Sequence, residues 1–534
     1  MNRTNLTIKN VKHFFFRHYY ILVFSIVYFL MLMTFINSPR FSDENDNFLG
    51  AMMVTYGRDI YSHYISQHMP LAYYIFAVPA WIFKINTVPA FRIAFYIILI
   101  TIWIAMYFRY RDKFGKFVLW AYPILYIFSM AFYDLHSCSA ISDQFQAQGL
   151  VILFLEFLYF LQTKSIDWKV SIFVSLGIVL SFGTTFVSSL AVFVIAVAVL
   201  YVDVKDLITK KIPILKWPIY FLKKYWLLMM LVALPFLVLV VWYAVTDNLY
   251  NFYFGAYKLN TTIYSKYVGT GQNILRDIAS TVSWYSNTFK GSVDSIATTG
   301  LISLKFIFFV AIHAMFCILF FKKHKEIVVF PIVFILMCGI RGFAGFHSMG
   351  YYAITFVMAC ILFKKYFLDK KSNQTVLAHV FVCTALASFS VQFLNGVPGM
   401  LDFRSAFKSC EYKNGSTEFL IKQLVHENEP IYVSTLDLEM YIRVNRYPVY
   451  SPSTSVPWMW EAYHEQDFYY LNQYNPKVLC HNDEYEIGGH KLKDYAPDFI
   501  NYVHEHYTLL SPEYPELFVR NEFLDDARKI MSKI

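Results

Sequence analysis

Charge is scarce in this sequence. Only 16% of the 534 residues are charged, whereas 57% are hydrophobic and 20% are aromatic, and soluble proteins average about 25% charged residues. Long apolar runs recur through the first three quarters of the chain. A soluble globular fold is therefore excluded, and the runs predict an all-α polytopic membrane bundle of about 11–13 spans.

Several motifs are also missing. The seven cysteines form no C-x-x-C pair and no zinc-binding spacing. There is no G-x-G-x-x-G motif and no P-loop, so we assign the chain no nucleotide. The first apolar run follows a basic segment and has no A-x-A-like cleavage site, so we expect a retained first helix rather than a signal peptide.

The apolar runs set the span count. We find twelve apolar stretches, at roughly 19–37, 69–86, 91–108, 116–133, 147–163, 169–185, 186–203, 224–245, 303–321, 326–340, 350–363 and 375–394. Twelve complete crossings would leave both termini on one side of the membrane. One stretch must therefore be re-entrant or interfacial, and the basic segment near 108–116 favours a stretch within 69–133.

Basic residues predict the orientation. Lys and Arg cluster at 205–224, 322–325 and 364–371, and cytoplasmic loops are enriched in these residues. With a cytoplasmic N-terminus, the segments expected outside are 38–68, 246–302, 341–349 and 395–534.

The last part of the chain differs in composition from the rest. From Asn395 onward there are 13 Lys and Arg against 21 Asp and Glu, although the whole chain has a net charge of +9. We read the basic remainder as cytoplasmic loops and infer no nucleic-acid partner. Short β-like runs ("PIYVST", "PKVLC") alternate with helical candidates ("STEFLIKQLVHEN", "PWMWEAYHEQDFYYLNQY"). We therefore expect a membrane domain at 1–394 and a small extracytoplasmic α/β domain at 395–534.

Cysteines occur in both of the expected domains. Cys410 and Cys480 lie in the C-terminal domain and could pair in an oxidising compartment. Four cysteines of the membrane domain lie in or beside apolar runs and are expected to be small core residues: Cys317, Cys338, Cys360 and Cys383.

Acidic residues gather after the first apolar run, in "SDENDNF" (42–48). One interpretation is a solvated turn. The alternative is a reactive site at the membrane surface, because the acids lie within a few residues of a helix end, where solvent screens charge less. A stretch with amphipathic spacing follows, which predicts a helix on the bilayer surface; its apolar positions are Phe48, Met52, Met53, Tyr56, Ile60 and Tyr64.

This arrangement resembles the GT-C superfamily of membrane glycosyltransferases, and in particular protein O-mannosyltransferases and aminoarabinose transferases. Those enzymes carry an Asp-Glu pair after the first helix, a surface helix with a glycine near its end, and a His/Lys-Pro-Pro-Leu-Tyr-Tyr entry to the next helix. The matching residues are Asp43, Glu44, Gly57, His68, Pro70, Leu71, Tyr73 and Tyr74. Met69 departs from the pattern, which weakens the match to either subfamily.

The resemblance implies roles for these residues. Asp43 would be the base or the group that orients the acceptor, with Glu44 second, while Asp46 has no counterpart and is expected to be solvated. GT-C enzymes carry a second acid in the next external loop, where Asp143 and Asp134 are the candidates. Asp143 would otherwise be a helix N-cap, a position that Asp favours. Two converging acids could also hold a divalent metal.

Two later segments supply candidate substrate-binding residues. The stretch 252–267 resembles the F-N-x-x-Y-x-x-Y segment of bacterial polyprenyl-dependent transferases through Asn260 and Tyr264, and Lys266 beside them suits a phosphate. An aromatic interfacial belt is the alternative. Arg341 and His347 lie at a short turn between apolar runs and resemble an R-G…H-x-x-Y-Y segment, in which Arg would bind the carrier phosphate with two hydrogen bonds. A snorkelling arginine is the alternative here.

Two polar residues stand alone within apolar runs. Glu156 and His313 are expected to be structural and paired inside the bundle.

The sequence thus favours an enzyme that moves a sugar from a polyprenyl-phosphate carrier to a hydroxyl of a glycan, lipid or protein acceptor at the outer membrane face. A carrier or flippase of lipid-linked saccharides is the first alternative, although transporters usually contain internal repeats and we find none. A polysaccharide polymerase or ligase is the second. The early Asp-Glu pair argues against both.

Overall fold

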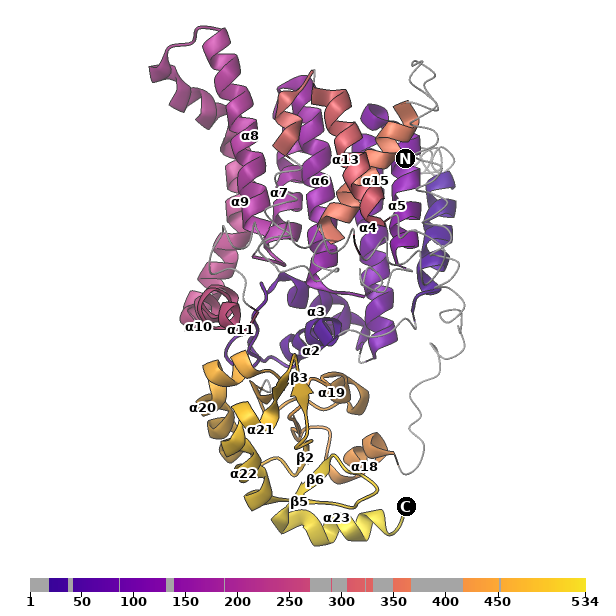
Figure 1. Ribbon diagram of the computed structural model, residues 1–534, viewed down its shortest axis with the longest axis vertical. Helices are drawn as coiled ribbons and strands as arrows, with labels where there is room; N and C mark the ends of the chain where they lie inside the picture. Colours follow the sequence, from indigo (N-terminus) through magenta and orange to yellow (C-terminus); the bar gives the residue numbers. More distant parts are fainter. Residues whose placement is uncertain are drawn as a thin grey trace, which may run out of the picture.

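The computed structural model has two parts, a helical bundle and a C-terminal tail that packs against one end of it (Figure 1). The residues it describes are 19–36, 42–85, 87–130, 139–186, 188–268, 290, 305–321, 323–329, 349–365, 416–450 and 453–534. We call the end of the bundle that meets the tail the tail end, and the other end the basic end.

Apolar helices form the bundle, as the composition predicted. Among the described residues, three helices are long and apolar enough to cross a membrane: Val88–Phe114 (α4), Ser142–Thr163 (α6) and the continuous run Ile214–Val245, which contains α9 (Trp217–Val245). The other bundle helices are an N-terminal helix at Tyr19–Met33, α3 (Leu71–Phe83), α5 (Lys116–Ser129), α7 (Trp168–Phe182), α8 (Ser188–Thr209), α13 (Lys305–Phe321) and α15 (Met349–Phe363). The predicted polytopic bundle is confirmed.

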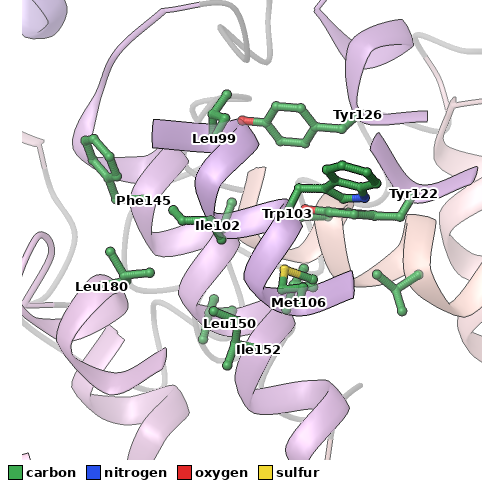
Figure 2. Packing of buried hydrophobic residues seen from close by; sticks show 14 of the residues in the cluster. Leu99, Ile102, Trp103, Met106, Tyr122, Tyr126, Phe145, Leu150, Ile152 and Leu180 are labelled. Carbon is green, nitrogen blue, oxygen red and sulfur yellow. The ribbon is translucent and has the colours of Figure 1, made fainter. Parts of the chain in front are cut away.

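Helix α6 is the centre of the bundle. In its most apolar 18-residue window 94% of the residues are buried, against 6% in α9. Buried side chains of α4, α5 and α7 belong to the same hydrophobic cluster as those of α6 (Figure 2). Gly149 lets α7 approach, because a Cβ at this position would lie 2.6 Å from the carbonyl oxygen of Gly177. Helix α9 instead exposes its apolar side chains, as expected of a helix that faces lipid.

The basic clusters lie together at one end. Lys205 Nζ, near the C-terminal end of α8, lies 3.8 Å from Glu326 Oε1, in the turn Lys325–Val328 that follows α13. Lys224 Nζ donates to the carbonyl of Lys164, at the end of α6, over 2.9 Å. The described residues of the clusters at 205–224 and 322–325 therefore lie at the same end of the bundle, while the side of a membrane that this end faces stays a prediction.

Helix α3 explains why the twelve apolar stretches cannot all cross. Its 13 residues span about 20 Å, less than the roughly 30 Å of a hydrocarbon core. At its start, Leu71 N donates to the carbonyl oxygen of Gly183, just past the end of α7. Its other end leads into the start of α4, where Arg92 donates to the carbonyl oxygen of Ile36 at the end of the first helix. Both ends of α3 thus lie at the tail end, so the stretch at 69–86 does not cross.

The tail is a small α/β unit. Its sheet has the order β1-β2-β6-β5, with β1 and β2 parallel and the other pairs antiparallel. The strands are β1 (Tyr432–Val433), β2 (Val478–Cys480), β5 (Tyr507–Leu509) and β6 (Leu517–Arg520), and β3 (Glu486–Ile487) with β4 (His490–Lys491) forms a separate pair. The helices are α18 (Thr417–Leu424), α19 (Glu439–Val444), α20 (Pro457–Tyr474), α21 (Leu492–Tyr495), α22 (Pro497–His506) and α23 (Leu524–Met531).

The tail elements agree with the sequence patterns. Both predicted strands, within 430–435 and 476–480, and both predicted helices are present as β1, β2, α18 and α20. The expected boundary at 394/395 lies outside the described residues. Cys480 is a buried free thiol in β2, so the structure shows no disulfide there, and Cys410 lies outside the described residues.

A buried carboxylate joins α20 to the sheet. Asp467 Oδ2 accepts hydrogen bonds from the Tyr432 hydroxyl (2.8 Å), from the backbone N–H of Ser453 (3.0 Å) and from the Ser453 hydroxyl. Burial is the largest influence and raises the pKa of Asp467 to about 7, although these hydrogen bonds oppose the shift.

Helix α2 (Ser42–Thr55) lies at the junction of the two parts. Its residues Phe48 and Met52 belong to the bundle core, whereas Leu49 and Met53 belong to a second core shared with the tail. The second core also includes Ile60 of the segment 56–70, which follows α2. We predicted a surface helix of about twenty residues; the helix ends at Thr55, and it is covered on both sides rather than lying free on a bilayer.

Candidate functional site

The acidic residues after the first helix lie within a helix rather than in a solvated turn. Asp43 and Glu44 are in the first turn of α2, where the partial positive charge of a helix N-terminus stabilises carboxylates. Gly57 follows the helix with a φ of +71°, a left-handed conformation that favours glycine. The solvated-turn interpretation is therefore wrong for this segment.

Glu44 is fully buried in an ion pair with Arg92 of α4. Arg92 Nε donates to Glu44 Oε1 over 2.9 Å and Arg92 Nη2 donates to Oε2 over 2.6 Å, and neither side chain is exposed. Arg92 Nη1 also donates to the carbonyl of Ile36, over 2.8 Å. A carboxylate held in this way cannot reach a substrate, so Glu44 joins three segments of the chain. Its predicted role as a second catalytic acid does not fit this geometry.

The same pair connects α2 to the start of α6. The backbone N–H of Ala140 donates to Glu44 Oε1, and Asn47 Nδ2 donates to the carbonyl of Ala140, each over 2.9 Å. Asp143 lies in the first turn of α6 and is 2% exposed. The N-cap of α6 is Ile141, so the interpretation of Asp143 as a helix N-cap is wrong. The starts of the helices that carry Asp43 and Asp143 are therefore adjacent.

Asp46 is half-buried and hydrogen-bonded, whereas we expected it to be solvated. Its Oδ1 accepts a hydrogen bond from the Tyr64 hydroxyl, and its Oδ2 accepts one from the Tyr73 hydroxyl over 2.7 Å. Both tyrosines are fully buried. Gly50, one turn after Asp46 on α2, makes room for the Tyr73 ring, because a Cβ there would lie 2.7 Å from Tyr73 Cε1.

His68 lies just before α3 and its backbone is held at both ends. Its N–H donates to Ser66 Oγ over 2.9 Å, and its carbonyl accepts from the Tyr61 hydroxyl over 2.5 Å. The side chain is half-buried. Within the part of the chain that the structure describes, its imidazole makes no hydrogen bond.

The predicted residues of 252–267 contact the segment before α3 or the tail. Asn260, in a π-helical turn (Asn260–Tyr264), donates from Nδ2 to the carbonyl of Gln67 over 2.7 Å. The ring of Tyr264 packs edge-on against Trp458 of α20 at 5.0 Å. Lys266 Nζ forms an ion pair with Glu461 of α20 over 3.0 Å.

These contacts give that region a clear structural role, the docking of the tail. Trp458 Nε1 also donates to Gln67 Oε1 over 3.0 Å, so the residue before His68 contacts both 252–267 and the tail. A substrate-binding role for Asn260, Tyr264 and Lys266 stays a prediction.

Three further candidates lie outside the described residues: Asp134, Arg341 and His347. The two intramembrane groups expected to be structural do have partners. Glu156 accepts from Arg109 Nε (2.7 Å), Arg109 Nη2 (3.1 Å) and the Tyr110 hydroxyl (2.9 Å), and His313 Nδ1 lies 3.4 Å from Thr355 Oγ1.

Arg92 was not identified from the sequence, and neither was the pairing of Tyr64 and Tyr73 with Asp46. Arg92 stands in the apolar stretch "AFRIAF", and the cost of a charge inside such a run is a signal that could have identified it. The tyrosines carried no such signal, because aromatic residues are common throughout this chain. Among the described residues, no group of three or more His, Cys, Asp and Glu side chains is placed to hold a metal ion.

Comparison with known proteins gives a match in fold. The sequence matches no family model and no curated protein sequence. The structure is similar to ArnT from Cupriavidus metallidurans bound to undecaprenyl phosphate, with a TM-score of 0.52 and 11% identity over 94% of this chain and 98% of that one. The apo state of the same protein gives a TM-score of 0.52 at 10% identity, with the same coverage. The chain thus shares its overall fold, a helical bundle with a C-terminal tail, with that protein.

Proposed function

We propose that the protein is a membrane glycosyltransferase that moves a sugar from a polyprenyl-phosphate carrier to an acceptor hydroxyl at the tail end of the bundle. The observation that carries this proposal is the junction of α2 and α6 through Glu44 and Ala140, which brings the helix starts bearing Asp43 and Asp143 together. The solved protein of the same fold binds undecaprenyl phosphate, a lipid of the proposed donor class.

The chemistry needs a base, and Asp43 is our assignment. The acceptor oxygen forms a bond to the anomeric carbon, the bond from that carbon to the phosphate oxygen breaks, and the acceptor proton passes to the carboxylate. Such proton removal contributes about 10²- to 10⁴-fold to a rate. Asp143 would orient the acceptor from the first turn of α6, and Glu44 supports both acids by holding α2 in place.

The leaving group is a phosphate on a lipid, so its binding groups must lie at the membrane boundary. His68 lies at the tail end, at the start of α3, and has a free imidazole among the described residues. We assign it to the phosphate, together with Arg341 and His347. Lys266 is the weaker candidate, because it forms an ion pair with Glu461.

The basic end of the bundle supports the proposed orientation. Cytoplasmic loops are enriched in Lys and Arg, so the tail end and the reaction are on the extracytoplasmic face of a cell membrane. The acceptor would be a cell-envelope glycan, a teichoic acid or a glycolipid.

Transfer should be measured with the full-length protein in lipid nanodiscs supplied with polyprenyl-phosphate sugars labelled in the sugar. We expect the label to leave one of the lipids, and Asp43→Asn and Asp143→Asn to lower this rate at least a hundredfold. Asp167→Asn is the matched control, since Asp167 caps α7 at the basic end and Asn caps equally well.

Two results would count against the enzyme. If Asp43→Asn and Asp143→Asn transfer sugar at the wild-type rate, neither acid has the proposed role. If the label instead crosses a vesicle membrane while still attached to its lipid, the protein is a carrier.

A further inference from the structure

One chain of hydrogen bonds connects the carboxylate of Asp46 to the backbone of His68. Tyr73 OH donates to Asp46 Oδ2 over 2.7 Å, Ser66 Oγ contacts Tyr73 OH, and His68 N donates to Ser66 Oγ over 2.9 Å. Tyr73 has a single hydroxyl hydrogen, which it gives to Asp46. Ser66 must then donate to the Tyr73 oxygen and accept from His68, so each donor along the chain points toward the carboxylate.

The charge of Asp46 determines that direction. A carboxylate only accepts hydrogen bonds, and bonds to a charged group are about twice as strong as those between neutral groups. Successive hydrogen bonds that point the same way also polarise and strengthen one another. An uncharged side chain at position 46 would leave the hydrogens of Tyr73 and Ser66 free to reverse.

The hydrogen bonds that lead from Asp46 to His68 are shielded from solvent. Tyr73 is 0% exposed and Ser66 is 1% exposed. Gly50 leaves the space that the Tyr73 ring occupies. The carbonyl of His68 is bonded independently by Tyr61, so both backbone groups of His68 are fixed while its imidazole makes no hydrogen bond within the described residues.

We propose that Asp46 is a positioning residue, which presents the imidazole of His68 to the phosphate of the lipid carrier. This inference rests on the proposed function, since it takes His68 as a phosphate-binding residue. It assigns Asp46 no contact with the substrate. Its effect should therefore be seen in the affinity for the phosphate lipid, and only through His68.

The test measures the binding of polyprenyl phosphate without a sugar to the full-length protein in nanodiscs. The hydrogen bond expected between the His68 imidazole and the phosphate is a bond to a charged group. Such a bond contributes about 1.5–3 kcal/mol, so its loss should lower the affinity for the lipid roughly 10- to 150-fold. We expect Asp46→Asn, Tyr73→Phe and His68→Ala each to weaken binding at least tenfold. Asp46→Asn together with His68→Ala should bind no more weakly than His68→Ala alone, because the two residues act as one unit.

Tyr64→Phe is the matched control. It also removes one hydrogen bond to the Asp46 carboxylate, but Tyr64 lies off the chain that reaches His68. Affinity should change less than threefold in this variant. A general loosening of α2 would instead weaken binding equally in Tyr64→Phe and Tyr73→Phe.

The kinetic readout separates positioning from catalysis. Asp46→Asn should raise the KM for the donor and leave kcat at saturating donor within threefold of wild type. A loss of kcat without a loss of affinity, additive losses in the double variant, or a wild-type protein that does not bind the lipid phosphate would each overturn the proposal. If the Asp46→Asn variant does not fold, the affinity of the Tyr73→Phe variant for polyprenyl phosphate tests the proposal instead. If the binding results hold but no sugar is transferred, the proposed function fails and the positioning role stands.

Discussion

Replacing Glu44 by Gln should damage the stability of the protein more than its chemistry. Gln keeps the shape and one acceptor oxygen, but its amide N–H₂ group would face the N–H donors of Arg92, which now surround Glu44 at 2.6 and 2.9 Å. Arg92 would then be a buried charge without a counter-charge. Breaking a buried pair in this way costs about 3–5 kcal/mol, a large share of the roughly 5–15 kcal/mol by which proteins are stable.

Helix α4 supplies a matched control at its other end. Arg109 is held by two bonds to Glu156, at 2.7 and 3.1 Å, much as Arg92 is held by Glu44. Glu156→Gln should therefore cost a similar free energy, although Glu156 lies at the basic end, far from the proposed site. Thermal unfolding of the purified variants in one detergent, with transfer rates normalised to folded protein, compares the two positions.

The expected pattern distinguishes a structural acid from a catalytic one. Both variants should unfold at lower temperature than wild type, and the folded fraction of Glu44→Gln should keep transfer within about tenfold of wild type, whereas Asp43→Asn should lose about 10²- to 10⁴-fold. Adding Arg92→Met to Glu44→Gln should recover stability, because no unpaired charge is left. A Glu44→Gln variant that is as stable as wild type and yet inactive would refute this reasoning and make Glu44 catalytic.

Three further predictions concern other parts of the molecule. Gly50→Ala should push the Tyr73 ring away from Asp46, lowering stability by about 1–3 kcal/mol together with affinity for polyprenyl phosphate; an unchanged melting temperature and affinity would contradict the tight packing seen here. Because the pKa of Asp467 is raised to about 7 in the folded tail, the folded state holds its proton more tightly, and local stability of the tail should fall by about 3 kcal/mol between pH 5 and pH 8. Amide exchange should show that fall in wild type and in the exposed control Glu465→Gln but not in Asp467→Asn, and an equal fall in all three would exclude Asp467 as its source. Arg341→Lys should fold but lose most transfer, since lysine lacks the planar fork; wild-type turnover would remove Arg341 from the phosphate site.

The sequence was sufficient for the architecture because its signals are local or additive. Apolar run length predicted the helices, and the density of Lys and Arg predicted which loops share the basic end. The alternation of patterns in the last part of the chain predicted two of the strands and two of the helices of the tail, β1, β2, α18 and α20. The stretch that does not cross was confined only to 69–133, because identifying it needed the position of both ends of α3.

The site was harder to predict because buried polar residues are defined by their partners. "SDENDNF" reads as a loop on composition alone, and nothing local shows that the partner of Glu44 is 48 positions away or that the partners of Asp46 are 18 and 27 positions away. Polar residues next to each other in the sequence can therefore differ in burial and in hydrogen-bond partners. Here Glu44 is a buried anchor, whereas the role that the family resemblance implies for its neighbour Asp43 stays a prediction.

The position of α2 between two hydrophobic cores gives a physical reason why a reactive acid would be placed there. A general base must be held still at the membrane boundary, because the carrier's isoprenoid chain keeps the phosphate near the helix ends. A helix lying free on a bilayer would not provide this. Helix α2 is packed against the bundle through Phe48 and Met52 and against the tail through Leu49 and Met53, and the buried pair of Glu44 with Arg92 fixes its first turn. The tail thus needs no catalytic group of its own to affect the reaction, because it forms one of the two surfaces that hold the acid-bearing helix in place.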